Sequence, residues 1–226
     1  MKTLIIGYGE IGKSLYSIFS KYYEVQVIDK KEKARIKPEI IHICFPYSKD
    51  FIKEVKKYQE ELNPKFTVIH STVPVGTSSK CGAIHSPVVG LHPHLEESIE
   101  TFTKFLGGEK AGEVADYFRK AGIKVYITDK SETTELMKIM STTYYATCVE
   151  YTKEVKRLCD KNKIPFEMWT LWTNNYNEGY DELGYPQYIR PNLIPNMKKI
   201  GGHCLIPNLD LIDSKFAEFI RSLNGK

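Results

Sequence analysis

The sequence lacks the features that mark several protein classes. Its five cysteines form no C-x-x-C pair, which argues against a disulfide framework and against a structural zinc site; they are Cys44, Cys81, Cys148, Cys159 and Cys204. No apolar run approaches the ~18–20 residues that a membrane-spanning helix needs. The net charge is only +4, from 32 basic and 28 acidic residues spread along the chain, whereas a nucleic-acid binder concentrates its charge on one face. We therefore expect neither a membrane nor a nucleic-acid partner.

What the sequence does contain is typical of a globular protein. The 226 residues are 42% hydrophobic and 27% charged, enough to form one large or two small domains around a real core. The chain opens on Thr3–Gly7, a short apolar strand that leads into a glycine turn. A signal peptide would need a longer apolar stretch and a small-residue cleavage site, so we expect a cytoplasmic protein.

The first part of the chain alternates short apolar runs with amphipathic helical patterns, which indicates a doubly wound α/β fold with a mostly parallel, Rossmann-like sheet. Strands are predicted at Lys2–Ile6, Val25–Ile28, Ile40–Cys44, Phe66–His70, Ala83–His85 and Lys124–Ile127. Helices are predicted between them at Ile11–Tyr22, Asp50–Leu62, Leu95–Phe105 and Ala111–Ala121.

The pattern changes after Asp129. A capping residue and an acidic first turn at Ser131 predict the start of a long helix that runs to about Asn162. Residues 166–200 are rich in Trp, Tyr, Asn, Gly and Pro, which favours an irregular region with aromatic anchors, and a last helix is expected at Leu209–Leu223. We therefore expect an NAD(P)-binding Rossmann domain at residues 1–129 and a helical domain for substrate binding and dimerisation at 130–226.

A glycine-rich motif follows the first strand and opens the first helix, the context that gives G-x-G-x-x-G its meaning. Its residues are Gly7, Tyr8, Gly9, Glu10, Ile11 and Gly12. The first glycine allows the tight turn, the second lets backbone approach a pyrophosphate, and the third allows close packing of helix on strand. The helix N-terminus would offer unpaired N–H groups to the phosphates.

Further candidate cofactor-binding residues lie at the ends of the neighbouring strands. Asp29 ends the second strand and can accept hydrogen bonds from ribose hydroxyls, which favours NAD over NADP, although Lys30 beside it weakens that preference. Phe45 and Pro46 follow the third strand, where Phe45 either walls the cofactor or packs in the core. The fourth strand leads to a Ser71-Thr72 pair that either faces the nicotinamide ribose or belongs to a simple helix cap.

Several motifs together resemble the nucleotide-sugar 6-dehydrogenases that act on UDP-glucose, GDP-mannose and UDP-N-acetylmannosamine. The motifs are the glycine turn, Ser71–Thr77, Glu135–Lys138 and Gly201–Cys204, in the family's order. The resemblance covers the first two of the family's three parts. It implies that Cys204 attacks an aldehyde intermediate, that Lys138 stabilises the oxyanion or holds water, and that hydride leaves for nicotinamide near Thr72.

The chain departs from the family's pattern at several positions. Thr142 stands where the family has an asparagine, and Asn208 stands where it has an aspartate, so a general base is missing. Val88 replaces an acidic residue, and Asn196–Ile200 replaces glycines. Ser86–Gly90 resembles the substrate loop of the wider 6-phosphogluconate and 3-hydroxyacid dehydrogenase superfamily, and His85 is similar to a histidine near the same strand of prephenate dehydrogenases. Together with Lys138, Thr142 and Asn208, the predicted substrate contacts are His85, Ser86 and His203.

These patterns predict an NAD-dependent oxidoreductase that oxidises an alcohol on a sugar-nucleotide-like or small hydroxy-acid substrate, and a homodimer formed through the long helix. The catalytic residues would be Thr72, Lys138 and Cys204. Cys81, His85, His92 and His94 carry ligand-type side chains, but their spacing is not that of a zinc site, so no metal is expected. The alternatives are a non-catalytic NAD(H) sensor and one subunit of a split dehydrogenase.

Overall fold

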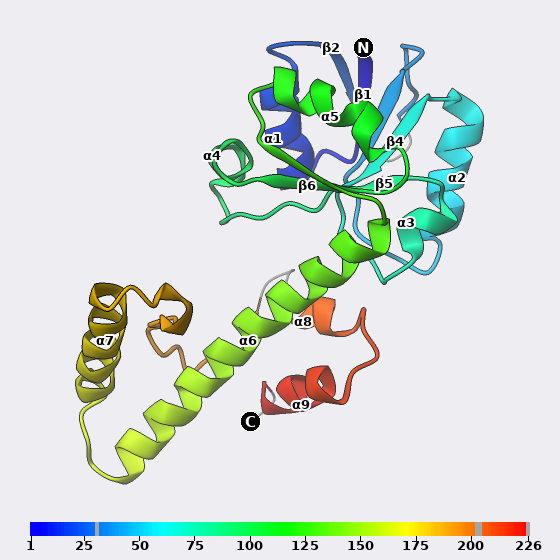
Figure 1. Cartoon of the computed structure of the whole chain (residues 1–226). Coiled ribbons are helices and arrows are strands. Elements are labelled where there is room, and N and C mark those ends of the chain that lie inside the picture. Colours follow the sequence, from blue (N-terminus) through cyan, green and yellow to red (C-terminus); the bar gives the residue numbers. More distant parts are fainter. Residues whose placement is uncertain (30–31, 202–204, 225–226) are drawn as a thin grey trace. The chain divides into compact units, whose positions relative to one another are not determined.

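A computed structural model describes residues 1–29, 32–201 and 205–224 of the chain (Figure 1). The chain divides into two compact units, Met1–Ile139 and Met140–Lys226. The division lies ten residues beyond the boundary expected at 129/130, because the first turns of the long helix α6 (Ser131–Lys161) group with the sheet. Within the described ranges no helix is both long and apolar enough to cross a membrane.

The first unit is built on a seven-stranded sheet. Its strands are β1 (Lys2–Ile6), β2 (Glu24–Ile28), β3 (Ile40–Ile43), β4 (Phe66–Ile69), β5 (Ile84–His85), β6 (Lys104–Gly107) and β7 (Val125–Thr128). They lie in the order β2-β1-β3-β4-β5-β6-β7, and every neighbouring pair is parallel except β5 and β6. This order confirms the predicted Rossmann-like, mostly parallel sheet. Strand β2 is added on one side of β1 and β3 on the other, so the strand order reverses between β1 and β3.

The carboxyl ends of five strands lie level with one another. The register pairs Ile6 with both Ile28 and Ile43, then continues through Ile69 to His85. Backbone hydrogen bonds of 2.8–2.9 Å extend the pairing one residue further along this edge. The residues that follow β1 to β5 therefore form one continuous row, as the carboxyl edge of a parallel sheet requires for a ligand site.

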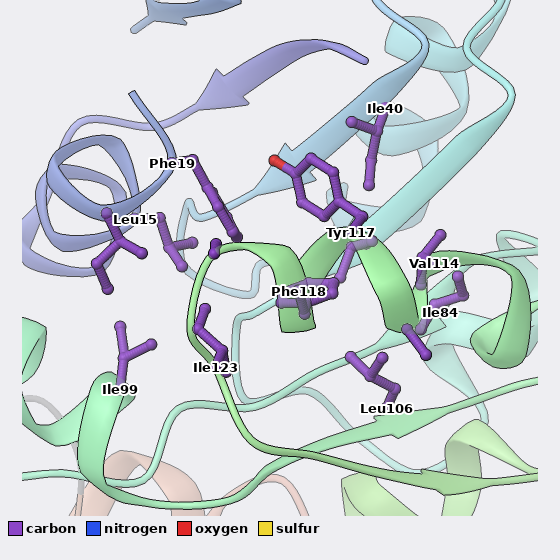
Figure 2. Packing of buried hydrophobic residues seen from close by; sticks show 14 of the residues in the cluster. Leu15, Phe19, Ile40, Ile84, Ile99, Leu106, Val114, Tyr117, Phe118 and Ile123 are labelled. Carbon is purple, nitrogen blue, oxygen red and sulfur yellow. The ribbon is translucent and has the colours of Figure 1, made fainter. Parts of the chain in front are cut away.

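Two apolar clusters cover the two faces of this sheet. One cluster joins α1 (Glu10–Phe19), α4 (Leu95–Thr101) and α5 (Ala111–Lys120) to it, with Phe19 and Phe118 fully buried (Figure 2). The other joins α2 (Phe51–Leu62) and residues beside the short α3 (Thr77–Lys80) to the opposite face. The sheet is therefore buried on both faces, which explains why its central strands read as continuous apolar runs.

Strand β6 was not predicted, because Lys104–Phe105 was assigned to the end of a helix that in fact ends at Thr101. Phe102 adopts an extended conformation and stops the helix. The chain then pairs with β7 and, at Gly107, with His85 of β5. Lys104 points inward, and a buried lysine hides the alternation that would have indicated a strand.

The second unit holds most of α6 together with α7 (Glu167–Glu182), a 3-10 turn at Pro186–Tyr188, α8 (Leu205–Leu209) and α9 (Lys215–Leu223). Its small core joins Ala146 of α6 to Leu209, Ala217 and Ile220. The last helix, predicted at Leu209–Leu223, begins only at Lys215, because Ser214 caps it there through its hydroxyl, and Leu209 is the last residue of the separate α8.

The prediction of an irregular region at 166–200 was wrong for α7. The returning segment supports this helix: Arg190 lies 3.4 Å above the ring of Tyr176 and exchanges two 2.9 Å hydrogen bonds with Asn177. These contacts join residues 13 or 14 positions apart, and such support is invisible to local propensity.

Candidate active site

The glycine turn has the geometry that its sequence predicts. Gly7 has a φ of +101°, and a side chain there would press on the backbone of Cys44 and Phe45 at 3.0 Å. A side chain at Gly12 would collide with the carbonyl oxygen of Gly7, so this residue lets α1 pack directly on the turn. Nothing lies within 4 Å of a Cβ built on Gly9, which leaves open space above the backbone where α1 begins.

This turn fits a dinucleotide pyrophosphate. Gly9 caps α1 without any side-chain hydrogen bond, so the first N–H groups of the helix keep their capacity to bind an anion. Tyr8 is exposed, with its ring edge-on to Tyr16, and Ile11 packs on the core. The carboxylate of Glu10 contacts Nδ1 of the His92 imidazole, and both side chains are exposed. No local sequence pattern predicts this contact.

The other predicted cofactor residues lie along the same edge. Asp29 follows β2 directly and is exposed, and its backbone N–H donates to Glu32 at 2.8 Å. Phe45 packs against Phe51 with ring centroids 5.1 Å apart, which favours the core-packing alternative, and Pro46 is exposed beside it. Lys30 lies outside the described residues.

The segment after β4 is tied to α6 by a carboxylate. Glu135 accepts hydrogen bonds from the backbone N–H groups of Gly76 at 2.6 Å and Ser78 at 2.7 Å. Burial raises the pKa of Glu135, and these hydrogen bonds oppose the rise. Ser71 donates to the carbonyl of Phe45 at 2.5 Å, while Thr72 stays half-buried beside it. Glu135 thus fixes the Gly76–Ser78 turn, which follows the predicted nicotinamide contacts in the chain.

Both ring nitrogens of His85 are used by the protein. Nε2 lies 3.1 Å from the Ser71 carbonyl, and because a carbonyl can only accept, this nitrogen carries the proton. Nδ1 lies 2.8 Å from the hydroxyl of Thr134 on α6. Burial lowers the pKa of His85 to about 3, so the ring is neutral. In this arrangement His85 ties β5 to β4 and α6 rather than presenting a base to a substrate.

Lys138 reaches the loop that follows β5. Its ammonium donates to the carbonyl of Val88 at 2.9 Å, one turn of α6 beyond Glu135. The hydroxyl of Ser86 in the same loop is buried and has no hydrogen-bond partner among the described residues. Lys138 and Ser86, both predicted from the sequence to contact substrate, therefore belong to one loop-and-helix assembly, together with the Gly76–Ser78 turn that Glu135 holds.

The second unit joins two of the positions at which the chain departs from the resembled family. Asn208 of α8 donates to the hydroxyl of Thr142 on α6 at 3.4 Å, and both side chains are buried. His203 and Cys204 lie outside the described residues, so their roles remain predictions. Within the described ranges no group of three or more ligand-type side chains could hold a metal ion.

One residue of this assembly escaped the sequence analysis. The amine of Lys104, on β6, lies inside the sheet unit and donates to the carbonyls of Ser86 at 3.0 Å and Pro87 at 3.3 Å. The pattern that could have revealed this strand and its buried lysine is period-two alternation, in which Lys104 and Leu106 are buried and Phe105 is exposed.

No protein-family model matches the chain. It is 27% identical over 198 residues to a UDP-N-acetyl-D-mannosamine dehydrogenase of Methanococcus vannielii, a match that covers 80% of this chain and 43% of that protein. Over its whole length it superposes on a UDP-D-ManNAc dehydrogenase of Pyrococcus horikoshii with a TM-score of 0.80 at 17% identity, covering 68% of that chain. These neighbours point to the nucleotide-sugar dehydrogenase family.

The likeness to nucleotide-sugar dehydrogenases lies in their N-terminal, NAD-binding part. This chain spans less than half the length of the M. vannielii dehydrogenase. A different neighbour matches almost end to end: the Mycobacterium tuberculosis 3-hydroxyisobutyrate dehydrogenase superposes with a TM-score of 0.72 at 11% identity, over 99% of this chain and 92% of that one. The fold is thus common to dehydrogenases of sugar nucleotides and of a small hydroxy acid.

Proposed function

We propose that this chain is an NAD-dependent dehydrogenase that oxidises an alcohol on a sugar-nucleotide-like or small hydroxy-acid substrate. The observation that carries the proposal is the alignment of one sheet edge. The glycine turn, the Ser71-Thr72 turn and the loop after β5 follow strands whose ends lie in register along it. On one helix, Glu135 holds the Gly76–Ser78 turn that follows the second, and Lys138 holds the third.

The cofactor would lie along this edge. Gly7, Gly9 and Gly12 shape the pyrophosphate turn, and Asp29 is placed for the ribose hydroxyls of NAD, where a 2′-phosphate would meet its negative charge. When bound, the nicotinamide supplies the acceptor for a hydride, and the alcohol becomes a carbonyl with release of one proton. Thr72 would face the nicotinamide side of the site.

Lys138 would act on the reacting oxygen. An ammonium beside the hydroxyl stabilises the negative charge that develops on oxygen as the hydride leaves. Its hydrogen bond to the carbonyl of Val88 orients the side chain. Ser86, on the loop that Lys138 holds, would contact the substrate.

The Thr142–Asn208 pair favours a single oxidation step over the two-step chemistry that the resemblance implies. An amide cannot act as a general base, and here its N–H group is directed to a neighbouring hydroxyl. With that base missing, hydrolysis of a covalent intermediate on Cys204 would be poorly assisted. Because this pair lacks the general base, a non-catalytic NAD(H) sensor and one subunit of a split dehydrogenase stay as alternatives.

The second unit would also form a homodimer. Tyr144, Tyr151 and Leu158 recur every seven residues along α6, and they are 60%, 59% and 49% exposed. Seven-residue spacing places these side chains along one stripe of the helix, the arrangement in which two helices pack together. A second copy of this chain would cover the stripe.

Calorimetric titration tests the proposal. NAD and NADP are titrated into the protein, alone and with UDP-N-acetylmannosamine, UDP-glucose or 3-hydroxyisobutyrate, while NADH formation is followed by absorbance. We expect NAD to bind more tightly than NADP and one substrate to give NADH. Failure of both dinucleotides to bind would refute the proposal, while binding without turnover of any substrate would favour the sensor or split-enzyme alternative.

Two alanine variants show whether binding occurs at the glycine turn. Gly12→Ala puts a methyl group against the Gly7 carbonyl and should abolish dinucleotide binding. Gly112→Ala on α5 meets nothing within 4 Å and should bind normally. Equal binding by the two variants would place the dinucleotide elsewhere.

A further inference from the structure

The loop after β5 is held from inside the sheet by a lysine and a histidine. The carbonyl of Ser86 accepts hydrogen bonds from Lys104 Nζ at 3.0 Å and from His70 Nδ1 at 2.8 Å, and the carbonyl of Pro87 accepts from Lys104 at 3.3 Å. The next carbonyl, that of Val88, accepts from Lys138. Three successive carbonyls of the candidate site are therefore fixed by nitrogen donors.

The histidine donor belongs to a chain whose proton positions follow from its contacts. His70 Nδ1 must carry a proton, since its partner is a carbonyl, so His70 Nε2 accepts from His42 Nδ1 at 2.9 Å. His42 Nε2 then accepts from the hydroxyl of Tyr117 at 3.3 Å. In this order a proton added to His70 Nε2 would face the N–H of His42 Nδ1, so that two donors would oppose each other.

Burial acts in the same direction on both rings. Burial lowers the pKa of His42 to about 3 and that of His70 well below its usual value. The His70 bond to the Ser86 carbonyl is therefore the same at pH 6 as at pH 9. Of the two groups that hold this carbonyl, the lysine is the one left to change its charge.

The surroundings of Lys104 leave its charge unbalanced. The titratable groups that face it are the thiol of Cys44 and the ring of His42 on β3, His70 following β4, His85 on β5 and the ammonium of Lys138 on α6. No carboxylate of the described residues lies within salt-bridge distance of Lys104. Burial lowers the pKa of Lys104 to about 7, with Lys138 adding to the decrease and Cys44 opposing it.

We propose that Lys104 is a positioning residue of the candidate site, and that the proton on its amine sets how firmly the Ser86–Val88 loop is held. A closed loop keeps the ammonium away from water, and opening the loop hydrates it, so the bound proton favours the open loop. Without the proton, the neutral amine donates to the same carbonyls at no such desolvation cost, and the loop that carries Ser86 and anchors Lys138 is held closed. The role in catalysis rests on the proposed dehydrogenase function; the hold on the loop does not.

Hydrogen exchange across a pH series tests the hold directly. Protection of the 84–91 segment, corrected for intrinsic exchange rates, should rise about tenfold between pH 6 and pH 8.5 in the native chain. The ε-carbon resonance of Lys104, in protein carrying ¹³C-labelled lysine, should titrate with the same midpoint and be absent from Lys104→Met. Unchanged protection across this range in the native chain would overturn the proposal.

Three variants separate the charge from simple packing. Lys104→Met removes the titrating group and should give protection without a step. Lys104→Arg keeps its charge throughout and should give low protection at every pH. Lys124→Met, an exposed lysine at the start of the neighbouring strand, should reproduce the native step. A native-like step in Lys104→Met would assign the titration to another group and overturn the proposal.

NADH binding measured on the same samples keeps this result apart from the proposed function. A chain that binds no NADH but shows the exchange step loses the dehydrogenase proposal and keeps the loop switch. A chain that binds NADH and turns over substrate, with KM independent of pH between 6 and 8.5 and unchanged in Lys104→Met, loses the positioning role.

Discussion

At the residue scale, Lys104 is a charged group inside a sheet, 4% exposed, whose partners are carbonyls rather than carboxylates. An ionised group in such a place is disfavoured unless it is paired. Here the fold keeps it where an apolar side chain would be more favourable, next to a loop of the candidate site. Groups that lower stability without an evident packing gain are expected at functional positions.

The pH dependence of stability should report this cost. The pKa of Lys104 is about 7 in the folded chain and 10.5 when unfolded, so between these values the unfolded chain binds more protons and native stability rises with pH. Lys104→Met lacks this contribution. Its free energy of unfolding, relative to the native chain, should therefore fall by about 2 kcal/mol between pH 7 and pH 9. Urea unfolding at several pH values measures the difference; a constant difference would mean that Lys104 titrates normally.

Glu135 gives a second prediction at this scale. Replacing it with glutamine swaps one acceptor oxygen for an N–H group that faces a backbone donor, so the hold on the Gly76–Ser78 turn is lost. Losing hydrogen bonds to a charged acceptor should lower the free energy of unfolding by about 2 kcal/mol and weaken NAD binding. Thermal unfolding and calorimetry measure both effects. Glu154→Gln, on an exposed part of the same helix, should change neither, and an equal effect of both variants would contradict this role for Glu135.

At the element scale, the sequence predicted elements whose side chains follow their own period. The parallel strands β1, β3 and β4 and the helix α6 were found because apolar residues or caps mark them locally. Strand β6 was missed because Lys104 occupies an inward position, and α7 was missed because its support comes from the segment around Arg190. Both failures involve contacts between distant residues, which no local pattern contains.

The same distinction applies to the candidate site. The conformation of the glycine turn and the close packing at Gly12 were predicted, since their constraints are local. The pairing of Thr142 with Asn208, the use of both His85 nitrogens and the Lys104 contacts are products of tertiary structure. Sequence therefore identified which residues line the edge, and it could not say which of them the protein uses for its own support.

The exposed stripe on α6 leads to a prediction about association. Leu158→Glu places a charge in the stripe and should shift the protein from dimer to monomer in light scattering coupled to size exclusion. Lys156→Glu introduces the same charge on another part of the helix surface and should leave the dimer intact. A native protein that is monomeric at micromolar concentration would contradict the assignment of this stripe.

At the scale of the whole molecule, the two units differ in the size of their cores. The sheet unit contains two extensive clusters, whereas the cluster of the second unit has four fully buried hydrophobic residues. The second unit also contains a buried ion pair, in which Lys153 donates to Glu150 at 2.7 Å, and buried pairs contribute little net stability. Its stability should depend more heavily on association than that of the sheet unit.

Calorimetric unfolding should therefore show two transitions. We expect the second unit to unfold first, at a temperature that rises with protein concentration, because dissociation of the dimer accompanies it. NADH should raise the upper transition alone, since the proposed dinucleotide site lies in the sheet unit. A single transition that shifts as a whole with NADH would contradict this division.

The hydrogen bond between Asn208 and Thr142 also constrains the mutational paths that connect this chain to the family pattern it resembles. Asn208→Asp is the accessible first step, because a carboxylate can accept the hydroxyl proton of Thr142 in the same space. Thr142→Asn as a first step would force a larger amide into a buried position against another amide. On a path toward the resembled pattern, the change to an acidic residue at position 208 would thus come before the change to asparagine at position 142.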